Sequence, residues 1–142
     1  MALLNYTTKI EAVKTVGEIQ GILAAHGATA ILIEYGNASV TALSFKIETP
    51  HGEVGIRLPA DPEAVLRVLA RQQLKTKVRL DHAQAVRIAW RIVKDWIEAQ
   101  LAIIETEMVC LEQVMLPYII TEDGQTLFER MKEQHFLLKE GK

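Results

Sequence analysis

Nine of the sixteen Lys and Arg residues lie between positions 57 and 94, a stretch that holds three acidic residues. Cationic side chains that gather on one surface can neutralise the phosphates of a nucleic acid, which releases condensed counterions. The first chemistry that the sequence suggests is therefore polyanion binding. The candidate contacts are Arg57, Arg67, Arg71, Lys75, Lys77, Arg79, Arg87, Arg91 and Lys94.

The stretch that follows carries the opposite charge. Positions 95–129 hold eight acidic residues and no Lys or Arg, so the net charge of −2 conceals two strongly charged blocks. Three interpretations stay open. The basic block contacts a polyanion, or it meets the acidic block of a second copy, or the fold places both blocks side by side and neutralises them.

Helical spacing would place several of the cations on common faces. Arg87, Arg91 and Lys94 follow one another at intervals of three or four residues, which lines one side of a helix. Arg67 and Arg71 are four residues apart and share a face in the same way. Such faces could track a phosphate backbone, or they could be solvated surfaces whose charges are paired within the molecule.

Aromatic residues near the basic block are few. Proteins that bind single strands use flat side chains on which bases stack. Tyr35, beside a predicted hairpin turn, is the candidate for that role. Trp90 and Trp96 are six residues apart and point to different sides of a helix, so we expect them in the core.

The sequence lacks the motifs that would indicate catalysis or cofactor binding. It has no glycine-rich phosphate-binding loop, and its four histidines are scattered at no metal-ligand spacing. No histidine is placed near Ser39 or Ser44, and Cys110 lies between two apolar residues of a predicted helix, where we expect a buried structural thiol. We therefore expect a protein that is not an enzyme and holds no cofactor and no metal.

Targeting signals are also missing from the 142 residues. No apolar run approaches the roughly 18 residues of a membrane span. The first residues lack the basic and apolar regions of a signal peptide. The single cysteine cannot form an internal disulfide, which is typical of a reducing compartment. We expect a cytoplasmic protein with no membrane partner.

Three stretches rich in β-branched and apolar residues predict an antiparallel meander, at 29–35, 40–49 and 54–58. The turn residues Gly36-Asn37 and Pro50-His51-Gly52 separate these stretches. Polar and apolar residues alternate along them, which predicts one face against a core and one face in water.

A short helix and a weak strand are predicted ahead of the meander. Alternation at 6–11 is typical of an edge strand, the fourth of the sheet. Thr15 and Glu18 have the spacing of a capping box, which predicts that a helix begins there. Gly27 is expected to end that helix, because glycine adopts the left-handed conformation without strain.

The second half of the chain is predicted to be mainly helical. Asp61-Pro62 is a typical helix start, and Asp81 with Gln84 has the spacing of a capping box. The long helix that follows is predicted over about 81–115, and Thr126 with Glu129 caps a last one. The alternating stretch 72–80 is either a strand with a basic face or a basic loop.

The long helix carries two adjacent apolar stripes, wider together than one core requires. One stripe can cover the sheet, and the other needs either the last helix or another copy of the chain, which favours a homo-oligomer. The first stripe contains Val86, Trp90 and Val93, and the second contains Ala85, Ala89 and Ile92.

These elements predict a single α+β domain over 1–142. Residues 1–60 are mainly sheet with a short helix, and residues 61–142 are mainly helical. The expected architecture is an antiparallel meander of three to four strands packed against helices, one of them long.

Three strings in the sequence resemble those of small uncharacterised phage and prophage proteins: Tyr6-Thr7-Thr8-Lys9-Ile10, the run 94–100, and Leu116-Pro117-Tyr118. The resemblance covers most of the chain and implies an origin in a mobile element, with no catalytic residues. The predicted meander followed by helices also resembles the core of single-strand annealing proteins of the Rad52-like kind, in architecture only.

Three functions are compatible with these features. The first is an oligomeric nucleic-acid binder that is not an enzyme, such as a phage protein for single-stranded DNA binding or annealing. The second is a phage-encoded interaction factor or inhibitor of a host defence protein, with the acidic block 95–129 as its working surface. The third is a binder of small ligands or nucleotides, with a site between subunits.

Overall fold

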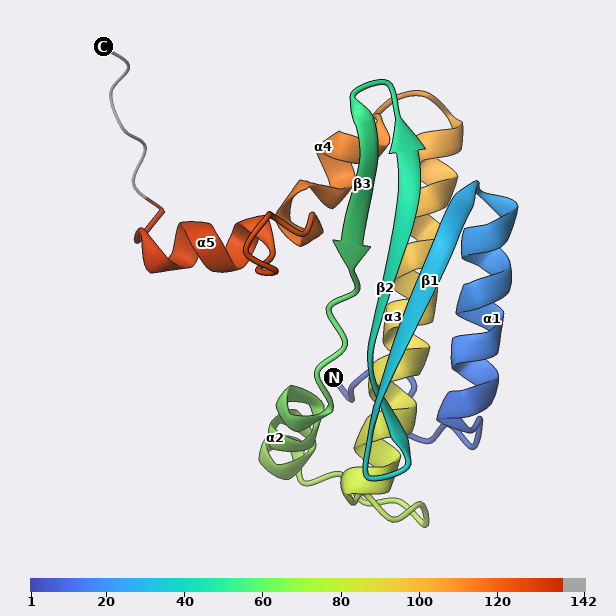
Figure 1. Ribbon diagram of the computed structural model, residues 1–142. Coiled ribbons are helices and arrows are strands. Elements are labelled where there is room, and N and C mark those ends of the chain that lie inside the picture. The colour runs from blue at the N-terminus through green and yellow to red at the C-terminus, as the bar shows by residue number, and fades with distance from the viewer. Residues whose placement is uncertain (137–142) are drawn as a thin grey trace.

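The computed structural model describes residues 1–136. The fold is α+β, as the sequence predicts (Figure 1). Its elements in chain order are helix α1 (Ala12–Ala25), strands β1 (Ala28–Gly36), β2 (Ser39–Thr49) and β3 (Gly52–Arg57), and helices α2 (Pro62–Gln72), α3 (His82–Glu105), α4 (Leu111–Met115), the 3₁₀ turn η1 (Leu116–Tyr118) and α5 (Leu127–Glu133).

The three strands form an antiparallel meander in the order β1-β2-β3. The predicted turn after β1 is present, and Asn37 and Ala38 both have positive φ, as tight hairpin turns require. Phe45 pairs with Ile31 on one side and Ile56 on the other, so these three side chains share one face of the sheet. Helices α1 and α3 cover that face, and no helix covers the other face of the sheet within residues 1–136 (Figure 1).

Trp90 lies at the centre of the core between the sheet and the helices. Its side chain has no exposed surface, as the sequence predicts, and its indole N–H donates a hydrogen bond to the Val40 carbonyl at 3.3 Å. Trp90 packs in one cluster with Leu43 and Phe45 of β2 and with Ile19 of α1. One stripe of α3 therefore does cover the sheet.

The first half of the second stripe of α3 is covered by α2 and the N-terminal segment, and not by the last helix. Ala85 and Ile88 are buried in a second cluster with Leu69 of α2. Leu3 and Tyr6 of the N-terminal segment pack against the same cluster. The cover extends over the first half of the stripe only, because Ala99 and Ile103 farther along it are exposed.

The strand predicted at 6–11 does not form. The buried Gln84 side chain donates hydrogen bonds from Nε2 to the carbonyls of Tyr6 (3.1 Å) and Thr8 (2.8 Å). These carbonyls are occupied by α3 instead of a neighbouring strand. Asp81 caps α3 as predicted, by accepting from the Gln84 N–H at 3.0 Å. The Gln84 side chain binds the N-terminal segment instead of completing a capping box.

Helix α3 ends at Glu105, ten residues before the predicted end near 115. The Thr106 hydroxyl donates to the Ile103 carbonyl at 2.5 Å and accepts from the Met108 N–H at 3.2 Å. Glu107 has a left-handed backbone, with φ of 65°. These local bonds compete with the helical ladder and end the helix.

This early end changes the surroundings of Cys110, and the prediction of a buried thiol is wrong. Cys110 stands at the N-cap of α4 and is exposed, instead of lying on the apolar side of a long helix. Its N–H donates to Oε1 of Gln113 at 2.8 Å. The thiol faces solvent because the chain turns between α3 and α4.

Other helix starts follow their capping residues. Asp61 accepts from the Ala64 N–H at 3.1 Å, and Thr126 and Glu129 form the predicted capping box of α5. Helix α1 instead begins at Ala12, ahead of the predicted start, and Thr15 is buried inside it. Among residues 1–136, no helix is both long and apolar enough to cross a membrane.

Candidate nucleic-acid interface

Two of the cations that the sequence places on α3, Arg87 and Arg91, are paired with acids at the N-cap and in the body of α1. The Nε atom of Arg87 lies 3.3 Å from Oε1 of Glu11. Arg91, whose side chain is largely buried, contacts the Glu18 carboxylate. Helix α1 packs along α3 and brings its acidic side chains to this face. These two cations are therefore paired within one molecule, as one interpretation of the helical faces expects, but their partners lie outside the acidic block 95–129.

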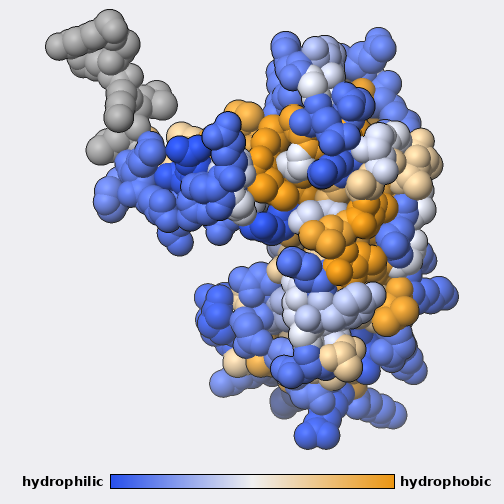
Figure 2. All heavy atoms as spheres, in the orientation of Figure 1, coloured by the Kyte–Doolittle hydropathy of each residue, from blue (hydrophilic) through white to orange (hydrophobic). Residues whose placement is uncertain are grey.

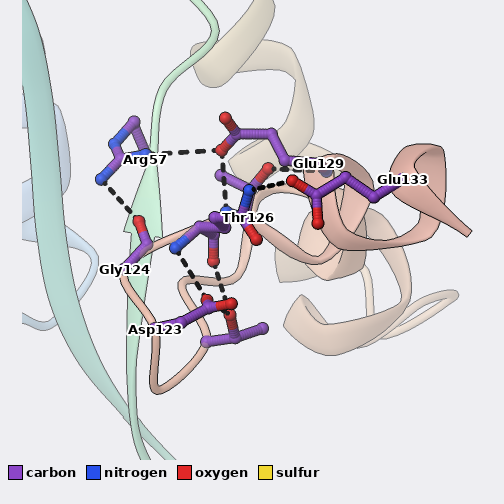
Figure 3. A network of polar contacts seen from close by, with 8 residues as sticks. Arg57, Asp123, Gly124, Thr126, Glu129 and Glu133 are labelled. Atoms are coloured by element: carbon purple, nitrogen blue, oxygen red, sulfur yellow. Dashed lines mark hydrogen bonds and ion pairs between the residues drawn. The ribbon is translucent and has the colours of Figure 1, made fainter.

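Two further predicted cations are also paired. The Lys94 Nζ lies 3.4 Å from Oε2 of Glu98, one turn along the same helix. Arg57 on β3 holds the segment before α5: its guanidinium donates to the Gly124 carbonyl at 3.1 Å and lies 3.5 Å from Glu129 (Figure 3). Arg57 and Lys94 thus contribute to the structure of the fold.

The Glu129 carboxylate is held in its charged form. The backbone N–H of Thr126 and the Thr126 hydroxyl lower the pKa of Glu129 below its ordinary value of 4.5, and Arg57 adds to this effect. The pKa of Asp123 is lowered as well, by the Thr121 hydroxyl and the Gln125 N–H. Both carboxylates favour the docked segment when they are ionised.

We expect the docking of residues 119–136 to weaken in acid. A carboxylate with a lowered folded pKa contributes stability above its ordinary pKa and loses it as the pH falls through the folded value. Amide hydrogen exchange of this segment should therefore accelerate as the pH falls below about 4.5, after correction for the intrinsic pH dependence of exchange. In Glu129→Gln the exchange should be faster at neutral pH and less dependent on pH. A wild-type profile equal to that of the variant would contradict the assignment.

Five predicted cations remain on the surface at one end of the molecule. We name the set Arg67, Arg71, Lys75, Lys77 and Arg79 the basic end. Its members lie on α2 and on the loop that leads to α3 (Figure 1). Residues 64–80 contain these five cations and no acidic residue. Within residues 1–136, four of the five make no ion pair, and Arg79, 3.4 Å from Asp81, keeps 90% of its side chain exposed.

The alternating stretch 72–80, for which the sequence allows either a strand with a basic face or a basic loop, is a loop after the end of α2. Gln73 ends α2 with a left-handed backbone. Leu74 and Leu80 pack against the cluster between α2 and α3. The loop is therefore anchored at both ends, and Lys75 and Lys77 between these anchors are exposed.

A hollow of about 410 Å³ borders the loop. Three cations line it, Lys9, Lys77 and Arg87, together with Glu11, which is paired with Arg87. Gln84 brings Lys9 there, because it binds the N-terminal segment to α3. Sequence reasoning missed Lys9, since this residue lies far from the basic block and carries no local signal.

Tyr35 lies at the same end of the molecule. The hairpin that follows it borders a hollow shared with Pro62 at the start of α2 and His82 at the start of α3. Tyr35 is 67% exposed, so its ring is accessible to solvent. Trp96 instead packs edge-on against Tyr118, with ring centroids 5.2 Å apart. Of the predicted residues, the basic end and Tyr35 therefore lie at the same end of the molecule. Arg57, Arg91 and Lys94 lie apart from them and are paired. Arg87 is paired as well, but it lines the hollow that also contains Lys9 and Lys77.

Two carboxylates of the acidic stretch 95–129 contact histidine side chains. Glu105 lies 2.5 Å from the His26 ring, and Glu112 lies 3.8 Å from the His51 ring. In the described part of the chain, no group of three His, Cys, Asp or Glu side chains could hold a metal ion.

Comparisons of the chain with protein-family models, with curated proteins and with solved structures find no match. The function has to be inferred from the charges and geometry of the chain itself.

Proposed function

We propose that this protein is a nucleic-acid binder that is not an enzyme, and that it holds a single strand across the basic end. The observation that carries the proposal is the gathering of five exposed cations with no acid among residues 64–80. A cation already paired with a carboxylate must give up that partner to bind a phosphate, whereas an unpaired cation need not. The basic end is therefore the part of the predicted track best able to neutralise phosphates.

The path of such a strand follows from where the cations lie. Arg67 and Arg71 are four residues apart on α2, and the loop continues the positive surface to the hollow lined by Lys9 and Lys77. A flexible single-stranded backbone can follow this turn more easily than a stiff duplex can. The exposed ring of Tyr35 offers a surface on which one base can stack.

The two other candidate functions have less support. The acidic block would serve a protein partner best if its carboxylates were free, yet several of them contact Arg57, Lys94, His26 and His51. The hollow lined by Lys9 and Lys77 has room for a small ligand, but its cations continue the positive surface of the basic end, which favours a phosphate of a longer chain.

A titration of a labelled single-stranded oligonucleotide, followed by fluorescence anisotropy, tests the proposal. Five phosphate contacts to a single strand predict that affinity falls about a hundredfold between about 50 mM and 200 mM salt. A duplex of the same length is the control and should bind more weakly. Absence of binding at the lower salt concentration would refute the proposal and would direct attention to a protein partner.

A further inference from the structure

The face of the sheet turned away from α1 and α3 is uncovered over β1 and β2 (Figure 1). The strand register assigns side chains to it, because residues paired across antiparallel strands point to the same side. Ala30 pairs with Lys46, Leu32 with Ser44, and Glu34 with Ala42. We name these six residues the open face.

The open face has an apolar centre. Leu32 is 61% exposed, whereas its neighbours Ile31 and Ile33 on the opposite face of β1 pack against the core. Figure 2 shows apolar residues gathered over the sheet on this side of the molecule. Ala30 and Ala42 beside Leu32 have short side chains, and Ser44, which pairs with Leu32, is buried, so another layer could approach closely at Leu32. Sheets that pack face to face lie about 10 Å apart.

The rim next to β3 is closed by the chain itself. Ile119 forms a bridge to Ile56, and the Ile120 N–H donates to the Gly55 carbonyl at 2.8 Å. The Ile120 side chain lies over Gly55, where an added Cβ would be 3.6 Å from Cδ1. The uncovered surface is therefore confined to β1 and β2.

The charges of the open face are complementary to themselves. Glu34 lies two residues after Leu32 on β1. Lys46 on β2 pairs with Ala30, so it lies at the level two residues before Leu32. In one molecule Glu34 and Lys46 are about 13 Å apart along the strand direction, at roughly 3.3 Å per residue, which is too far for an ion pair. Lys46 instead contacts Glu53 of β3 at 4.0 Å, but 62% of its side chain stays exposed, so it can also reach a carboxylate of another copy. Consider a two-fold axis at the level of Leu32 that lies between the two sheets, parallel to them and perpendicular to the strands. Rotation about this axis brings the level of Glu34 in one copy onto the level of Lys46 in the other. Glu34 of each copy would then lie beside Lys46 of the other.

We propose that a second copy of this chain covers the open face, with the two sheets packed face to face around Leu32. The contact buries the two Leu32 side chains against each other and forms two Glu34–Lys46 ion pairs between copies. It is isologous, as two-fold contacts are, and therefore closed at the dimer. The strands of the two copies run in opposite directions, so the two basic ends lie at opposite ends of the dimer.

Sedimentation equilibrium of the full chain and its variants tests this arrangement. The wild-type protein should have twice the mass of one chain at about 100 μM, where a micromolar Kd gives mostly dimer. Leu32→Lys should raise the Kd at least about tenfold, because two charges would face each other at the centre of the contact. Val13→Lys places the same change on an exposed apolar residue of α1, away from the open face, and should leave the Kd unchanged.

A charge exchange makes the test independent of any loss of folding. Glu34→Lys and Lys46→Glu should each weaken association by several-fold, because each places like charges together. The double variant Glu34→Lys/Lys46→Glu should restore association, and only contacts between copies can produce that restoration. A monomeric wild type at about 100 μM, a Leu32→Lys variant with the Kd of the wild type, or a double variant as weak as the single ones would each overturn the proposal.

Discussion

Replacing Lys75 and Lys77 with alanine should weaken the binding of a single-stranded oligonucleotide on the order of tenfold at about 50 mM salt. Both side chains are exposed on an anchored loop and make no ion pair in residues 1–136. Their removal should therefore cost phosphate contacts without disturbing the core. The slope of log affinity against log salt should fall by about 0.7 for each lysine removed.

A matched variant separates this local effect from a change in net charge. Arg130→Ala/Lys132→Ala also removes two positive charges, from α5, which lies apart from α2 and the loop (Figure 1). Its affinity and salt slope should stay close to those of the wild type. Equal losses in the two double variants would mean that net charge alone governs binding. Unchanged affinity in Lys75→Ala/Lys77→Ala would remove the basic end as the site.

Trp90→Ala should lower the free energy of unfolding by about 3–5 kcal/mol, the range for deleting a buried aromatic side chain. Trp90 has no exposed surface and lies between β2 and α1, so its loss leaves a cavity at the centre of the core. The substitution also removes the donor that satisfies the Val40 carbonyl. This is the largest effect on stability that we expect from a single substitution.

Urea denaturation followed by far-UV circular dichroism measures this effect in a way that does not depend on tryptophan fluorescence. Trp96→Phe is the control, because Trp96 is half-buried and an aromatic ring at this position keeps its contact with Tyr118. Its cost should be about 1 kcal/mol. A similar small cost for Trp90→Ala would show that the core closes around the missing side chain or is loosely packed.

The strands and most helix starts could be predicted from the sequence because their signals are local. Alternation over a few residues marks β2 as half-buried, and a capping side chain reaches a backbone N–H only two or three residues away. Asp61, Asp81 and Thr126 cap their helices for this reason.

The strand at 6–11 and the end of α3 were mispredicted because other contacts override the local pattern. Gln84 takes the carbonyls of Tyr6 and Thr8 from a position more than 70 residues away. At the end of α3 the apolar periodicity continues past Thr106, but the chain turns there and α4 packs separately. Periodicity shows which side chains can be buried, and it does not show where the backbone has to turn.

The sequence by itself determined the fold class and the presence of a concentrated positive charge. Only the tertiary structure decided which of those charges are available to a ligand. Arg87 and Glu11 are 76 residues apart, and Arg91 and Glu18 are 73 apart, so no local spacing announces their pairing. They meet because α1 and α3 pack side by side on one face of the sheet. A charge is neutralised by its neighbours in space, and for residues so far apart along the chain those neighbours are set by the packing of the core.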